Sequence, residues 1–298
     1  MSSESVTATR TGLLMALAAA FLFSTKPILI KWLYSLGMTA LPLMGLRMLL
    51  SVPVYILVGW LAWRKLPEKP ATRQLLKAAG IGLLGYYLAS YLDLKGLEYI
   101  SAQLERLMLY AYPTLVIILG ALFFGQAFQR HHLIALLLTY AGLLLVYGQD
   151  LSIAGDIRSI TTGTLLVLGS ALSFAFYMLF SKNAIGRMGS LLFTSVAMGS
   201  ASVATFVHYL ISEGMNLPPM TTTLWLGAAA LALFATVLPT FMVSEAIKRI
   251  GPARASVTGT IGPVMTTLMA VIFLNEPFGW ATAVGMGLVL IGVSKLQR

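Results

Sequence analysis

The sequence predicts an all-α membrane protein with ten transmembrane helices in two inverted five-helix repeats. Of its 298 residues, 58% are hydrophobic and only 10% are charged, and the mean hydropathy is +0.86. Soluble domains carry about a quarter charged residues. Apolar stretches of about 20 residues, long enough to cross a bilayer, follow one another along the whole chain. Since five is odd, a second copy of a five-span unit must enter the membrane in the opposite orientation.

Short polar connections separate the ten apolar segments. We expect spans at residues 12–33, 40–63, 75–95, 101–124, 132–148, 162–181, 190–211, 224–247, 253–274 and 279–295. The first begins soon after Arg10 and runs well past the small residues at 16–18, so we interpret it as a span and not as a cleaved signal peptide. The spans divide into a first repeat over residues 1–150 and a second, inverted repeat over residues 151–298.

The repeat is visible when the sequence is shifted by 150 residues. Pro113 then aligns with Pro263, and Gly142 aligns with Gly292. Few identities survive the shift, but a proline at the same depth of two corresponding spans, with matching span order and length, is unlikely to arise by chance. The shift therefore supports a duplicated five-span unit.

The distribution of basic residues predicts the orientation in the membrane. Of the Lys and Arg residues in connections, only Lys31, Lys95 and Arg158 fall on the side opposite the N-terminus. Because cytoplasmic loops are enriched in Lys and Arg, both termini are expected in the cytoplasm of a multi-pass protein of the inner (plasma) membrane. The net charge of +10 is thus interpreted as a topology signal, not as a nucleic-acid surface. The expected partners are the lipid bilayer and a small-molecule substrate, with the chain a monomer or weak homodimer.

The order and spacing of several motifs resemble the drug/metabolite transporter superfamily, and most closely its EamA-type exporters. A proline lies in the middle of spans four and nine, and those spans close with Gln126 and Glu276. Arg47 early in span two and the segment 97–102, Leu-Glu-Tyr-Ile-Ser-Ala, also match that pattern. The resemblance covers nearly the whole chain. It implies a ten-span exporter of amino acids, aromatic ones among them, or of other small metabolites.

Five charged residues fall within or at the ends of the first four spans at a similar depth. They are Lys26, Arg47, Asp93, Glu105 and Arg106. A charge in a span is costly unless it has a partner or faces a cavity, so each marks a candidate functional site. We expect them to form an outer gate that breaks and reforms during transport. The alternative is a static network that holds the helix ends, and the two deepest cations could also meet a substrate carboxylate.

A central binding cavity is expected from aromatic and hydroxyl residues near the middle of the spans. The candidates are Tyr86, Tyr87, Ser90, Tyr91, Tyr110, Pro113, Phe174, Tyr177, Thr240 and Pro263. Aromatic rings suit an apolar or aromatic ligand, and hydroxyls can orient its polar groups. The alternative is that these rings only pack helix against helix or face lipid.

The sequence accordingly predicts a secondary transporter that exports small metabolites, with aromatic or hydrophobic amino acids as the best candidates, by alternating access. Export of other polar metabolites or of drugs is the alternative, and an intramembrane enzyme or a channel fits less well. No paired-aspartate or nucleophile–base motif is present, so no enzyme activity is expected. No cofactor and no metal site are expected, and the lack of a central carboxylate favours facilitated export over proton antiport.

Overall fold

The computed structural model describes residues 3–125, 127–214, 216–217, 219–258 and 261–296, and no strand occurs within these ranges. In chain order the elements are α1 (Ser3–Ser35), α2 (Ala40–Lys65), α3 (Thr72–Gly82), the π-helical segment η1 (Leu83–Leu88), α4 (Ala89–Leu97), α5 (Ala102–Leu109), α6 (Tyr112–Phe124), α7 (Arg130–Ala154), α8 (Ile157–Met188), α9 (Ser190–Glu213), α10 (Thr222–Ala232), the π-helical segment η2 (Leu233–Val237), α11 (Leu238–Thr258), α12 (Ile261–Leu274) and α13 (Trp280–Lys295).

These helices account for the ten predicted spans. Eight helical segments are each long and apolar enough to cross a membrane, and the shorter apolar helices α12 and α13 belong to the last two spans. The all-α membrane fold predicted from the sequence is confirmed.

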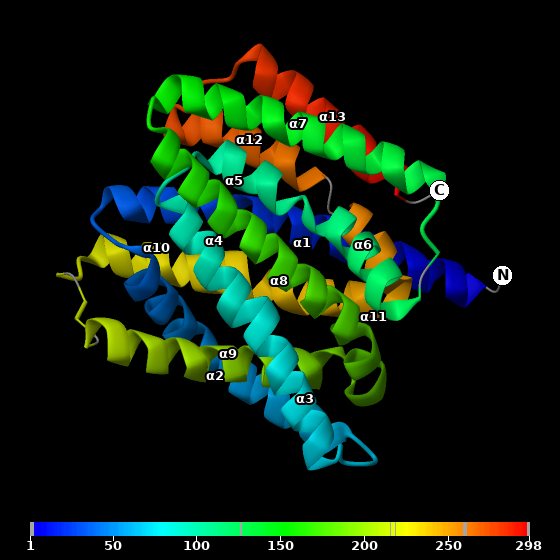
Figure 1. The fold of residues 1–298 in the computed structure, drawn as a ribbon. Coiled ribbons are helices and arrows are strands. Elements are labelled where there is room, and N and C mark those ends of the chain that lie inside the picture. Colours follow the sequence, from blue (N-terminus) through cyan, green and yellow to red (C-terminus); the bar gives the residue numbers. More distant parts are fainter. Residues whose placement is uncertain (1–2, 126, 215, 218, 259–260, 297–298) are drawn as a thin grey trace.

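The packing of the helices shows how the two halves are related. Helices that occupy the same place in the two halves pack together, α2 with α9 and α7 with α13, at the bottom and the top of Figure 1. Helix α1 packs along α11, and its counterpart α8 packs along α4. This exchange of partners is what a two-fold axis through the α2–α9 and α7–α13 contacts produces, so the halves form an inverted repeat.

Irregular backbone recurs at the predicted spacing of 150 residues. The π-helical segments η1 and η2 begin at Leu83 and Leu233. The left-handed residue that ends α6, Gly125 (φ 63°), corresponds to Asn275 (φ 54°) beyond the end of α12. A non-glycine residue with positive φ is uncommon, and asparagine adopts it more readily than most. The duplicated unit has therefore kept its backbone even where its residues differ.

The expected span 101–124 is not one continuous helix. Helix α5 ends at Leu109 and α6 begins at Tyr112, with a turn at Tyr110 and Ala111. Pro113 sits in the first turn of α6, where its missing N–H leaves no helical hydrogen bond unmade. The proline therefore starts a helix instead of kinking one. In the second half, the chain turns at Gly251 (φ 79°) between the eighth and ninth spans, and residues 259–260 lie outside the described part of the chain.

Helices α7 and α8 are longer than the apolar windows 132–148 and 162–181 that predicted them. The hydrogen-bonded helix continues into polar residues at both ends, so hydropathy alone underestimates its length. A single short turn joins the two: Gly155 is left-handed, and the Asp156 carboxylate then accepts hydrogen bonds from the backbone N–H groups of Arg158 and Ser159. This caps the start of α8.

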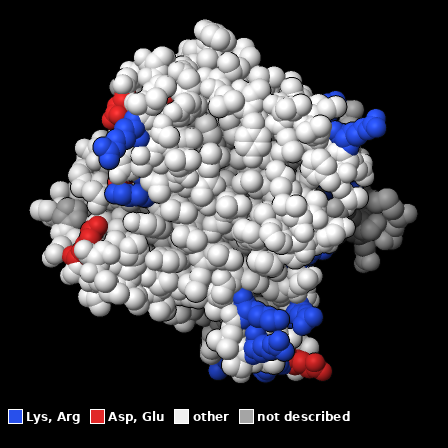
Figure 2. All heavy atoms as spheres, viewed as in Figure 1, with Lys and Arg blue, Asp and Glu red and all other residues white. Residues whose placement is uncertain are grey.

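The surface carries its charges in separate groups. Figure 2 shows a broad uncharged face, with one group of basic side chains below it and others towards the sides. The lower group covers the α2–α3 connection, where Arg64, Lys65, Lys69 and Arg73 are exposed. Large apolar side chains face outward elsewhere, with Ile211 79% exposed. An uncharged band flanked by charge is typical of a protein surrounded by lipid.

Small residues allow α7 and α13 to approach closely. A Cβ atom added at Gly142 would collide with the backbone carbonyl oxygen of Gly285, and one added at Gly285 would lie 2.7 Å from the carbonyl oxygen of Gly142. By contrast, nothing lies within 4 Å of a Cβ added at Gly148 or Gly287. The small-residue face of α13 is thus used inside the molecule at Gly285.

We predict that Gly142→Ala destabilises the fold while Gly148→Ala, on the same helix, does not. The first forces two backbones apart and is expected to cost about 1–3 kcal/mol. The second fills open space and gains helix propensity of up to about 1 kcal/mol. Thermal unfolding of the purified variants in detergent measures both, and equal unfolding temperatures for the two variants would contradict this packing.

Candidate functional site

A cavity with a volume of about 150 Å³ lies between the two halves of the molecule. Its lining comes from both repeats: Ala16, Ala20, Phe23, Lys26, Arg47, Gly85, Tyr86, Ala89, Ser90, Asp93, Arg106, Leu109, Tyr110, Tyr112, Ser170, Phe174, Met178, Met198, Ala235, Thr236, Thr240, Val243 and Ala255. A cavity of about 150 Å³ holds a ring the size of benzene, so this one has room for the apolar body of a small solute.

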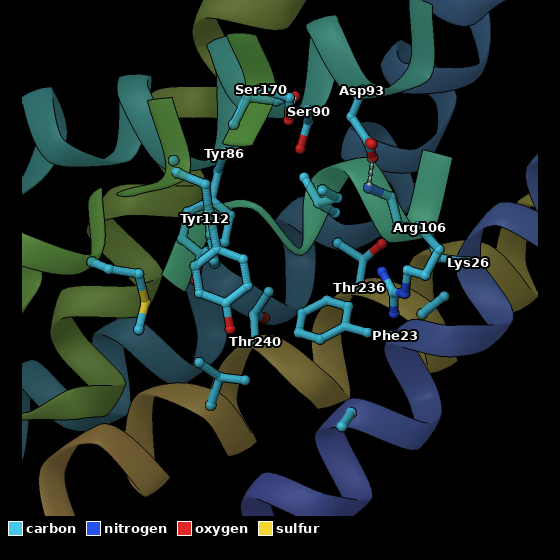
Figure 3. Close-up of a pocket in the computed structure, with 18 of the residues that line it drawn as sticks. Phe23, Lys26, Tyr86, Ser90, Asp93, Arg106, Tyr112, Ser170, Thr236 and Thr240 are labelled. Carbon is cyan, nitrogen blue, oxygen red and sulfur yellow. Dashed lines mark hydrogen bonds and ion pairs between the residues drawn. The ribbon is translucent and has the colours of Figure 1, made fainter. Parts of the chain in front are cut away.

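Aromatic rings form one wall of the cavity. Figure 3 shows the rings of Phe23 and Tyr112 projecting into it, with Thr236 and Thr240 beside them. The Tyr112 ring meets Phe174 edge to face, with 5.2 Å between centroids. Such contacts hold rings in fixed orientations while leaving their faces available to a ligand.

The irregular segment η1 places Tyr86 at the cavity. Its hydroxyl hydrogen-bonds to that of Tyr177 at 2.8 Å. Hydroxyls of α8 meet the backbone around η1, where Ser173 donates to the carbonyl of Leu84 and Ser170 donates to that of Ala89. Side-chain donors from a neighbouring helix thus stabilise a widened turn that exposes its face to the cavity.

The charged residues gather at one end of the cavity. Lys26 on α1 and Asp93 on α4 form an ion pair with 2.5 Å between Nζ and Oδ2, and both side chains are nearly buried (Figure 3). Among the five charged residues predicted to cluster, this is the one ion pair within 4 Å in the described part of the chain. Glu105 interacts directly with Asp93, while Arg47 and Arg106 form no ion pair within this distance in the described part of the chain.

Arg47 and Arg106 line the cavity although they are only 2% and 5% exposed. The Nε and Nη2 atoms of Arg47 and the Nε atom of Arg106 have no hydrogen-bond partner among the described residues. Glu105 is 2% exposed, interacts with Asp93 and stays behind the lining. The cluster therefore holds guanidinium nitrogens that no described residue satisfies.

The predicted cavity residues divide into two groups. Tyr86, Ser90, Tyr110, Phe174 and Thr240 lie in the lining. Those outside it are Tyr87, Tyr91, Pro113, Tyr177 and Pro263.

The residues outside the lining have other contacts. The Tyr87 hydroxyl lies 3.2 Å from Nδ1 of His208, and the Tyr91 ring stacks edge-on against the same imidazole. Tyr177 supports Tyr86 from behind, and Pro113 and Pro263 are buried in the first turns of α6 and α12.

Several lining residues were not among the candidates. On α1, Ala16, Ala20 and Phe23 recur with the helical period and lead to Lys26, so they share one face with it. That spacing from an in-span lysine is a usable signal. Ser170, Met178 and Val243 carry no comparable signal in the sequence.

Carboxylates from distant parts of the chain hold the start of α5, the helix that carries Glu105 and Arg106. The Glu276 carboxylate accepts hydrogen bonds from the backbone N–H groups of Ala102 and Gln103 at 2.7 and 3.1 Å. Asp150 accepts from both the N–H and the hydroxyl of Ser101. Negative groups stabilise a helix N-terminus. The acidic residue that closes span nine is thus fixed on the other repeat, while Gln126 lies outside the described residues.

Two further carboxylates hold the starts of α2 and α9, which are equivalent in the repeat. Glu98 accepts from the N–H of Ala40 at 2.7 Å and pairs with Lys95. Glu245 accepts from the hydroxyl of Ser190 at 2.5 Å and pairs with Arg249. Glu245 and Arg249 are four residues apart on α11, a spacing at which side chains of a helix meet. We call these two contacts the α2 latch and the α9 latch.

Comparison with known proteins gives the same fold and class. The EamA-like transporter family matches residues 10–148 and 161–296. The exact division of the repeats between residues 150 and 151 stays a prediction. The chain is 29% identical to the uncharacterized transporter YcbK of Bacillus subtilis, over 96% of this chain and 92% of that protein.

Other similar proteins lie at greater distance. The protein RarD of Escherichia coli is 27% identical over 91% of this chain and 88% of that protein. One crystal structure with 18% sequence identity superposes over 96% of both chains with a TM-score of 0.70. That structural similarity supports the fold alone.

We predict that Asp93→Asn destabilises the protein more than Lys26→Gln does. Removing one partner of a buried ion pair leaves the other uncompensated, at about 3–5 kcal/mol. Asp93 also faces Arg106, so after loss of Lys26 it keeps a cation nearby, whereas loss of Asp93 leaves three cations against Glu105. Thermal unfolding in detergent measures the difference, with Glu68→Gln on the exposed α2–α3 connection as control. A larger loss for Lys26→Gln would contradict the order.

Proposed function

Because this chain belongs to the EamA-like transporter family, we propose that it exports small metabolites by alternating access and that aromatic or hydrophobic amino acids are its best candidate substrates. The observation that carries this proposal is the cavity between the repeats, which combines aromatic rings, hydroxyls and a charged end. Transporters of this architecture bind their substrates at the interface between repeats.

The chemistry of the lining supports an amino-acid-like solute. The rings of Phe23, Tyr112 and Phe174 offer apolar surface, and the hydroxyl of Ser90 offers a donor and an acceptor. A polar metabolite without an apolar body would leave those rings against water. A lipophilic cation would meet Lys26, Arg47 and Arg106, which repel it.

The two latches suggest how access could alternate. Glu98 and Glu245 fasten the starts of α2 and α9, which lie at opposite ends of the bundle because the repeats are inverted. Each contact joins elements that are far apart in sequence through one hydrogen bond, so each can break without unfolding a helix. With Lys26, Arg47, Asp93, Glu105 and Arg106 as the outer gate, opening at one end would accompany closure at the other.

The proposal includes the orientation and the energy source. Both termini lie in the cytoplasm, as the basic connections require, and the protein resides in the inner (plasma) membrane. Asp93 is the one acidic residue among the described residues that line the cavity, and it is already paired with Lys26. Facilitated export down the solute gradient is therefore favoured over proton antiport. Among the described residues of this lining, no group of side chains resembles an intramembrane enzyme's catalytic set or a channel's selectivity filter.

Transport by the purified protein in liposomes tests the proposal. We expect saturable uptake of labelled phenylalanine, leucine or a related amino acid, and stimulation of that uptake by unlabelled substrate on the opposite side. A carrier shows this counterflow, whereas a channel does not. Linear uptake without counterflow would contradict a carrier, and transport of other metabolites alone would shift the substrate to the alternative class.

The gate is tested in the same assay. Neutralising the buried carboxyl in Glu105→Gln removes a charge that faces Asp93 and Arg106, and we expect initial rates to fall about tenfold or more, which corresponds to about 1.4 kcal/mol in the barrier. The control Glu68→Gln changes an exposed residue by the same charge and should transport normally. If Glu105→Gln protein inserts normally and transports at the wild-type rate, the proposed role of Glu105 in a gate is wrong.

The orientation is tested by cysteine labelling, for which the natural chain is well suited because it contains no cysteine. We expect an impermeant maleimide added to intact cells to label Arg158→Cys, at the start of α8, and to leave Lys69→Cys, in the α2–α3 connection, unlabelled. Permeabilised cells should label both. Labelling of both positions in intact cells, or of Lys69→Cys alone, would contradict the proposed topology.

A further inference from the structure

We propose that the cavity recognises one carboxylate of its solute through Arg47 and Arg106, and that an ammonium group on the solute is dispensable. The substrate class is then monocarboxylates with an aromatic or branched apolar body, of which amino acids are one subset. This inference rests on the proposed transport function and narrows it to a ligand chemistry.

The first argument is the charge balance of the cluster. Three cations, Lys26, Arg47 and Arg106, face two carboxylates, Asp93 and Glu105, and all five are buried or nearly so. The cluster therefore carries at least one positive charge in excess. Buried charges are stable only when they are paired. A monoanion in the cavity supplies the missing charge.

The second argument is geometric. Three guanidinium nitrogens, Nε and Nη2 of Arg47 and Nε of Arg106, are buried without a hydrogen-bond partner among the described residues, and both side chains line the cavity. An unsatisfied buried donor is destabilising, and more so when it is charged. Guanidinium groups match the planar geometry of a carboxylate and bind it with paired hydrogen bonds. A carboxylate is thus the ligand that satisfies these donors.

The third argument is that an ammonium group finds no comparable partner. Asp93 is the acidic residue in the described lining, its Oδ2 atom is held by Lys26, and its carboxyl also interacts with Glu105. Its Oδ1 atom has no hydrogen-bond partner but lies beside that second carboxyl. An incoming cation would also have to approach Lys26 and two arginines. Apart from Asp93, the described lining offers an ammonium group hydroxyls and aromatic ring faces, which carry no net charge to balance it.

The fourth argument concerns the orientation of the solute within the cavity. In the repeat, Asp93 and Glu105 correspond to Val243 and Ala255, and these two apolar residues also line the cavity. Met178 and Met198 line it as well. One end of the cavity is thus charged and the other part apolar, so a solute with a carboxylate at one end and a hydrocarbon body fits with its carboxylate towards Arg47.

A matched ligand series tests the proposal by direct binding to the purified full-length protein in detergent. Phenylalanine carries both charged groups, 3-phenylpropanoate carries the carboxylate only, and 2-phenylethylamine carries the ammonium only. Leucine, 4-methylpentanoate and isopentylamine form a second series with a branched body. Isothermal titration calorimetry measures all six. We expect the carboxylates without ammonium to bind within a few-fold of the amino acids, and the amines to bind at least tenfold more weakly.

Variants identify the groups that bind. Arg47→Gln and Arg106→Gln should each weaken carboxylate binding at least tenfold, and Arg47→Lys and Arg106→Lys should restore part of it because they keep the charge. Arg158→Gln removes a cation outside the cavity and should bind like the natural protein. Gel filtration in detergent checks that each variant is folded, and the lysine variants give the answer where a glutamine variant does not fold.

Three outcomes would overturn the inference. They are tighter binding of either amine than of its matching acid, binding of amino acids without binding of the acids, and no binding of any carboxylate. If the acids bind as expected but liposomes show no transport, the carboxylate site stands and the proposed transport function fails. If liposomes transport a solute without a carboxylate, transport stands and the inference fails.

Discussion

The constraint on which this structure depends is that backbone N–H and C=O groups inside a membrane must be satisfied by the protein itself. The helices around the cavity are interrupted or widened, and they are stable because side chains hydrogen-bond to backbone groups that have no partner within the helix. Glu276 and Ser101 hold the start of α5, Ser173 meets the carbonyl of Leu84 in η1, and Thr266 donates to the carbonyl of Ser24 in α1. Each contact joins elements far apart in sequence or caps a helix end. The hydrogen bonds that satisfy this irregular backbone therefore also link the two repeats to each other.

The inverted repeat has kept its backbone and changed its chemistry. The π-helical segments and the positive φ of Gly125 and Asn275 recur at a spacing of 150 residues, and a carboxylate contacts the start of the helix in both α2 and α9. The charged cluster does not recur, since the counterparts of Asp93 and Glu105 are Val243 and Ala255. The two ends of the molecule thus share a backbone arrangement but differ in side chains. The charged end binds water and anions more strongly than the apolar end does.

The sequence was sufficient for the parts of the fold that obey a period or a composition. Span number, repeat spacing and the charged cluster follow from hydropathy, from Pro113 and Pro263, and from in-span charges. The sequence was insufficient where a local departure from α-helical geometry decides which side chains face the cavity. A π-helical turn has no sequence signature, since η2 precedes Pro239 but η1 has no proline, and such a turn changes which residues face the cavity. Tyr87 and Tyr91 consequently meet His208, while Tyr86 faces the cavity.

Under the proposed alternating access, the excess positive charge would link ligand occupancy to closure of the charged end. Opening would let water solvate Arg47 and Arg106, and closure would remove that water from guanidinium nitrogens that have no partner in the described structure. A carboxylate that neutralises them lowers the free energy of the closed form but contributes less to the hydrated one. A ligand shifts a conformational equilibrium only by such a difference in affinity. The same two arginines that select the solute would thereby make its presence the condition for closing behind it.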